Sequence, residues 1–227
     1  MRGFYWRWIL GNGVAEALGL GGTLMLAGVA ADALGPQTAA PTILVGAAVA
    51  ILFGAFLEGT VIGFFQARVL RGALAGFPVG RWIGATTIGA GLAWTLGMVP
   101  STVISLVTSG DAALSVQPSV EPPAALIWLL AAGLGLVLGP FLGWPQARVL
   151  RSRLAHPYRW IGANMAAWAV GMPLIFAAMG TLPPDPSAVR IAVTAVLGSL
   201  TAGLAVGAIH GVWLARALGR QEPPLAV

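Results

Sequence analysis

The nine residues GFFQARVLR at positions 63–71 return as GWPQARVLR at positions 143–151, with seven of the nine identical. Each copy ends a long apolar segment. After the first copy comes Arg81-Trp82-Ile83-Gly84-Ala85, and after the second the same five residues follow, beginning at Arg159. Agreement over this length and at this spacing indicates an internal repeat. The chain is therefore predicted to contain several copies of one structural unit.

The unit occurs three times. Residues 7–11, Arg-Trp-Ile-Leu-Gly, provide a third copy of its opening. The closing pattern, two glycines four apart and then a polar residue, starts at Gly59, Gly139 and Gly203. We expect one domain over residues 1–227, made of three helical hairpins at about 7–71, 81–151 and 159–218. Each hairpin crosses the bilayer twice, so the copies are parallel and related by a pseudo-threefold axis along the membrane normal.

Six apolar runs are long enough to cross a bilayer, which takes about 20 residues each. They lie at about 8–31, 42–66, 82–107, 124–147, 160–182 and 189–214, with Pro, Gly, Asp and Gln between them. The predicted class is an all-α polytopic membrane protein with six transmembrane helices. Four prolines fall inside these runs, where we expect kinks: Pro100, Pro140, Pro145 and Pro173.

Composition supports this class and excludes others. Hydrophobic residues make up 58% of the 227 residues and charged residues only 8%, against roughly 25% charge in soluble domains. The chain has no Cys and no Lys, which excludes Cys-ligated metal centres and a lysine Schiff base. No phosphate-binding loop or nucleophile motif is present, so we expect neither an enzyme nor a cofactor.

Arginine placement predicts the orientation. Eleven of the twelve arginines fall at the predicted ends that include both termini, and one falls on the other side. By the positive-inside rule both termini are cytoplasmic, as in a bacterial inner-membrane protein. The arginines form membrane-edge anchors rather than a nucleic-acid-binding face, and Trp6, Trp8, Trp82 and Trp160 beside them are predicted to form an aromatic belt. The anchors nearest the repeats are Arg68, Arg71, Arg81, Arg148, Arg151 and Arg159.

The repeated Trp-Ile-x-Gly openings and Gln-x-x-x-Leu-Arg closings resemble those of a group of uncharacterised bacterial multi-span membrane proteins. The resemblance covers most of the chain and implies no activity. Membrane lipids are the partners expected from composition, and a homo-oligomer or a larger membrane complex stays open.

One set of polar residues recurs with the repeat and is predicted to form a layer near the cytoplasmic side. In this layer the glycines four apart let neighbouring helices approach closely. One interpretation is an interhelical hydrogen-bond clamp, which the repetition favours. The other is a ligand or headgroup site, with His210 as an axial ligand for a pigment magnesium. The layer contains Asn12, Gln66, Thr86, Gln146, Asn164 and His210.

Two carboxylates do not recur. Glu16 lies about 12 Å along its helix beyond Trp8, and Glu58 lies about 12 Å before Gln66, so both reach a matching mid-membrane depth. A carboxylate facing lipid there costs at least ~2.5 kcal/mol, so we expect both to face the interior and to share one proton. They either join two helices or serve a proton or cation relay. Two functions follow: movement of a small solute, proton or ion, or a non-catalytic subunit or lipid- or pigment-associated partner of a membrane complex.

Overall fold

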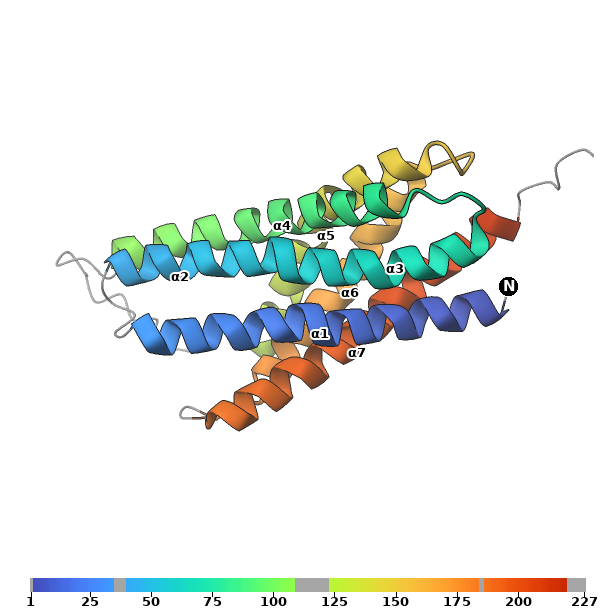
Figure 1. The fold of residues 1–227 in the computed structure, drawn as a ribbon. Coiled ribbons are helices and arrows are strands. Elements are labelled where there is room, and N and C mark those ends of the chain that lie inside the picture. Colours follow the sequence, from blue (N-terminus) through green and yellow to red (C-terminus); the bar gives the residue numbers. More distant parts are fainter. Residues whose placement is uncertain (1, 35–39, 109–122, 184–185, 220–227) are drawn as a thin grey trace, which may run out of the picture.

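The computed structural model describes residues 2–34, 40–108, 123–183 and 186–219, and these residues are almost entirely helical (Figure 1). Six of the resulting rods are long and apolar enough to cross a bilayer, which confirms the predicted all-helical, multi-pass class. The helices are α1 (Arg2–Leu34), α2 (Ala40–Phe53), the π-helix η1 (Gly54–Glu58), α3 (Gly59–Ala73), α4 (Val79–Thr108), α5 (Ala124–Leu150), α6 (Arg159–Met179) and α7 (Ala188–Gly219).

The six rods pack as a closed ring. Because the residues flanking η1 keep helical backbone angles, α2, η1 and α3 form one continuous rod. This rod packs between α1 and α4, and α4, α5, α6 and α7 follow in order until α7 returns to α1. Figure 1 shows α1, the α2–η1–α3 rod and α4 running alongside one another, with α7 crossing α1 at an angle. The ring encloses an interior that no single helix pair could form.

Three tryptophans fill this interior at the arginine-rich end. Trp8, Trp82 and Trp160 are fully buried, and the ring centroid of Trp160 lies 6.1 Å from each of the other two. The predicted aromatic belt is therefore wrong for these three residues, although Trp6 is 60% exposed. A tryptophan beside an arginine at a span end has two stable positions, the lipid interface or the centre of the bundle, and these three occupy the centre.

Close backbone contacts join the neighbouring rods. A Cβ added at Gly63 would lie 2.9 Å from the Cα of Ile83, and the same distance is 3.1 Å between Gly143 and Ile161 and 3.0 Å between Gly207 and Ile9. Real Cβ atoms essentially never come within 3.0 Å of another atom, and distances of 3.0–3.4 Å are tighter than nine in ten of their contacts. Glycine at these three positions is what lets α3 meet α4, α5 meet α6, and α7 meet α1 at this separation.

The four in-span prolines lie inside uninterrupted helices, at Pro100 in α4, Pro140 and Pro145 in α5, and Pro173 in α6. Pro145 is buried and Pro140 and Pro173 are partly buried, whereas Pro100 is exposed. The predicted outer loops around residues 35–39 and 109–122, and residues 184–185 of the third, lie outside the described residues.

Candidate functional site

A cavity of about 280 Å³ lies inside the helix ring, between α1, η1, α4, α5 and α6. Glu58 is the acidic residue of its lining, and Trp94 contributes an indole beside it. The rest of the lining is apolar and includes Leu20, Leu24, Met98, Leu138, Trp168, Met172 and Phe176. The cavity thus combines an apolar wall with one carboxylate, a pairing typical of sites that bind small molecules.

The π-helix places Glu58 in this wall. At its first residue, Gly54, a Cβ would overlap the indole of Trp94, so only glycine leaves room for that ring. At its last residue, Glu58, the carboxylate Oε2 accepts a hydrogen bond of 2.9 Å from Trp94 Nε1. Thr23 connects α1 to the start of the π-helix, because its hydroxyl donates a hydrogen bond of 3.3 Å to the carbonyl oxygen of Phe53. Single-turn π-helices occur frequently at functional sites.

Glu16 lies in the same part of the bundle as Glu58, on the side of α1 that faces α7. It is 2% exposed and Glu58 is 6% exposed, so neither carboxylate faces lipid. A Cβ at Gly19, one turn beyond Glu16, would lie 3.0 Å from the Cα of Glu58, and one at Gly203 of α7 would lie 2.6 Å from the Cγ of Glu16. Glu16 Oε2 is buried and has no hydrogen-bond partner among the described residues.

The six residues of the predicted polar layer are all buried, and four of them, Asn12, Gln66, Thr86 and Gln146, are joined to one another by side-chain hydrogen bonds. Gln66 receives a hydrogen bond of 3.2 Å from the indole of Trp82 and donates to Asn12 at 2.8 Å. Gln146 does the same one repeat later: the indole of Trp160 donates to it at 2.8 Å, and it donates to the hydroxyl of Thr86 at 2.9 Å. A further hydrogen bond of 3.3 Å, from the side-chain nitrogen of Gln146 to the side-chain oxygen of Gln66, links these two sets of hydrogen bonds.

Three side chains of this layer also donate hydrogen bonds to backbone carbonyls. Asn12 donates to the carbonyl of Trp8 at 2.8 Å, Thr86 to that of Trp82 at 2.9 Å, and Asn164 to that of Trp160 at 3.0 Å. Each of these side chains thereby satisfies a carbonyl of its own helix. The amide oxygen of Asn12 and the hydroxyl oxygen of Thr86 remain as acceptors for the glutamines.

His210 occupies the position in α7 that corresponds to Gln66 in α3 and Gln146 in α5, but it makes different contacts. It is 2% exposed, its ring packs on that of Trp160 with centroids 4.5 Å apart, and neither ring nitrogen has a hydrogen-bond partner among the described residues. The indole nitrogen of Trp8 is also buried and without a partner there. A pigment magnesium needs a histidine nitrogen that a broad planar ring can approach, and both nitrogens of His210 are enclosed. The pigment-ligand alternative would require the residues around His210 to move apart.

The sequence patterns assign no role to Trp94, Trp168 or Met172, whereas all three line the cavity. A signal for Trp94 was present. An indole N–H in the middle of a span needs a hydrogen-bond partner, and Glu58 is the carboxylate at matching depth. No comparable signal marks Trp168 or Met172, because apolar side chains that line a cavity and those that fill a core have the same residue types.

Comparisons of the chain with protein-family models, with curated proteins and with solved structures find no match. Among the described residues there is no group of three His, Cys, Asp or Glu residues that could hold a metal ion. The carboxylate-lined cavity is therefore the feature on which a function can be built.

Proposed function

We propose that this chain is a membrane transport protein that carries a small organic cation through the interior of its helix ring, with Glu58 as the group that binds the positive charge and Glu16 as its partner. One observation carries this proposal: the carboxylate of Glu58, held by Trp94, lies in the wall of an otherwise apolar cavity. Binding of a cation and binding of a proton at this pair would be mutually exclusive, which would couple solute movement to proton movement.

The lining favours an organic cation over an inorganic ion. A bare metal ion needs several oxygen ligands, usually six or more for calcium, and the described part of the cavity lining presents a single carboxylate. A cation with an apolar body instead matches both parts of the lining. The faces of Trp94 and Trp168 can attract the charge, at about 2 kcal/mol when desolvated, and the flexible side chains of Met98 and Met172 can adapt to the body.

We further propose that the ring is built from three parallel hairpins around a pseudo-threefold axis, and that the cavity lies on this axis. The lining supports this, because positions equivalent in the repeat line it together: Leu20, Trp94 and Met172 lie twelve residues after the three buried tryptophans, and Leu24, Met98 and Phe176 lie sixteen after them. The contacts of Gly63, Gly143 and Gly207 also match across the repeat. In this arrangement the polar layer acts as the clamp that holds the ring together.

The proposed orientation puts both termini and the polar layer on the cytoplasmic side of a bacterial inner membrane. The asymmetry of eleven arginines to one supports it. The chain would then be a non-enzymatic carrier whose cavity lies deeper in the membrane than the clamp.

The experiment is a binding and uptake assay with benzyltrimethylammonium, a cation with one aromatic ring. Purified protein in vesicles should bind it, and Glu58→Gln should weaken binding at least tenfold because the amide carries no charge. Leu138→Met is the matched control, since Leu138 occupies the equivalent position of the next repeat and lines the same cavity. Equal binding by wild type and Glu58→Gln would refute the proposal.

A second candidate, a subunit of a larger complex or of a homo-oligomer, has one specific observation in its favour. Residues 124–130 at the outer end of α5 are all exposed, which covers every face of nearly two helical turns. Trp128, Leu129 and Leu130 are 49%, 69% and 64% exposed. Mild-detergent purification separates the two candidates: a colourless, self-sufficient chain that binds the cation supports transport, and stoichiometric co-purifying subunits support assembly.

A further inference from the structure

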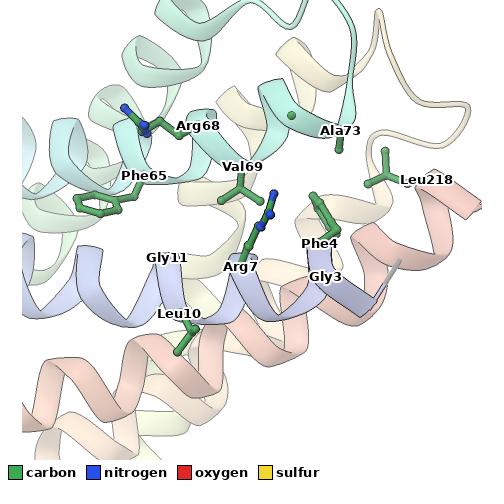
Figure 2. Close-up of a pocket in the computed structure, with 11 residues that line it drawn as sticks. Gly3, Phe4, Arg7, Leu10, Gly11, Phe65, Arg68, Val69, Ala73 and Leu218 are labelled. Atoms are coloured by element: carbon green, nitrogen blue, oxygen red, sulfur yellow. The ribbon is translucent and has the colours of Figure 1, made fainter.

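A large groove runs along the outer surface of the bundle at the arginine-rich end, between the first turns of α1 and the last turns of α3 (Figure 2). Its volume is about 830 Å³. Small residues on both helices make room for it, because a Cβ added at Gly3 or Gly72 would meet no atom within 4 Å. The groove is thus a recess in the protein surface and not a space filled by neighbouring side chains.

Two arginines supply its charge. In Figure 2 the side chain of Arg7 extends from α1 across the groove toward Val69 of α3. Arg68 lies at the rim, where its guanidinium sits 5.5 Å from the ring centroid of Phe64. Among the residues that the structure describes, no acidic side chain lines the groove and neither arginine has an ion-pair partner.

The groove also has an apolar part. Leu10, Gly11 and Phe65 line it one helical turn deeper than the arginines, toward the middle of the span. Leu10 is 58% exposed, so this wall faces the surroundings of the bundle. A ligand that fits the whole groove has an anionic head at the level of Arg7 and an apolar tail that runs deeper.

We propose that this groove is a specific site for an anionic bilayer phospholipid. The phosphate of the lipid pairs with the guanidinium of Arg7, and Arg68 is the second donor. The part of the acyl chain nearest the headgroup lies against Leu10 and Phe65. A phosphate offers the acceptor oxygens that match the planar donor fork of arginine. Basic pockets between helices on the cytoplasmic side are a known type of headgroup site. This inference is independent of the interior cavity and of the proposed transport function.

The test is native mass spectrometry of the full chain, released from nanodiscs that contain phosphatidylglycerol and phosphatidylcholine of the same acyl composition. Wild type should retain one phosphatidylglycerol in preference to phosphatidylcholine. Arg7→Gln should lower that retention about tenfold and Arg68→Gln severalfold. Arg148→Gln should leave it unchanged, because Arg148 occupies the equivalent position of the next repeat, lies over Trp144 and does not line the groove.

A second variant tests the shape of the groove without altering its charge. Gly72→Leu puts a side chain into the open space and should lower lipid retention as strongly as Arg7→Gln, while circular dichroism shows an unchanged helix content. Equal losses in Arg7→Gln and Arg148→Gln would overturn the site, since they would indicate unspecific attraction. So would full retention by Gly72→Leu. Displacement of the lipid by millimolar inorganic phosphate would overturn its assignment to a phospholipid.

Discussion

Two substitutions in the buried polar layer, His210→Gln and Gln146→His, should change the stability of the protein in opposite directions. Gln146 and Gln66 each accept a bond from a tryptophan indole and donate to a side chain of another rod, at distances between 2.8 and 3.2 Å. His210 makes neither bond, and the indole nitrogen of Trp8 beside it is buried without a partner. His210→Gln should place an amide that reaches both Trp8 and Asn164, because Gln66 and Gln146 make the corresponding bonds.

The expected magnitude follows from the bonds gained. Two interhelical hydrogen bonds at ~0.6 kcal/mol each, with a buried indole donor relieved at about 1 kcal/mol, stabilise the variant by roughly 2 kcal/mol. Gln146→His should lose the corresponding bonds to Trp160 and Thr86 and destabilise by a similar amount. The measurement is the free energy of unfolding in mixed micelles titrated with sodium dodecyl sulfate.

His156→Gln is the matched control, since this exposed loop histidine changes in the same way without entering the layer. Its free energy of unfolding should stay within 0.5 kcal/mol of wild type, as is usual for surface substitutions. A His210→Gln variant no more stable than wild type would refute the equivalence of position 210 to Gln66 and Gln146. In that case His210 serves a purpose that glutamine cannot replace.

Two further predictions concern packing and orientation. Gly207→Leu should unfold at much lower detergent concentration than Gly46→Leu, because a Cβ at Gly207 would lie 3.0 Å from the backbone of Ile9, whereas Gly46 has open space around it; equal tolerance would contradict the close contact. A single cysteine at Ser187 should react with an impermeant thiol reagent added to intact cells and one at Ala75 should not, because the arginine-rich end is predicted to be cytoplasmic; labelling at Ala75 would reverse the topology.

The helices could be predicted from sequence because hydropathy and length are local properties. A run of about 20 apolar residues has few stable alternatives to a helix in a bilayer, and the six runs become the six long rods. The repeat in turn predicts which residues share a depth. It thereby predicts as one set the five polar residues that the structure shows hydrogen-bonded in the layer.

Other features depend on contacts between rods and could not be read from one segment. The interior position of Trp8, Trp82 and Trp160 is one, since an arginine-flanked tryptophan has the same sequence signature at the lipid interface. The π-helix is another. It results from the indole of Trp94 fitting against Gly54, which neither span reveals alone. The cavity requires five elements at once, so no pattern within a span predicts it.

The departures from the repeat lead to the strongest argument about function. In the proposed arrangement of three hairpins, glycines at the contacts and polar residues in the proposed clamp are required, and both recur in the sequence. They do not require a carboxylate, and at the positions equivalent to Glu58 the chain has Leu138 and Ala202. Burying a carboxylate there works against stability unless a partner offsets the cost. Here Trp94 supplies one hydrogen bond to Glu58 while Glu16 Oε2 is left without any among the described residues. A pair kept only for structure would be expected to have its hydrogen bonds completed. Under the proposed transport function this unmet acceptor would take up a cation or proton, and it lies one helical turn from Leu20 of the cavity lining.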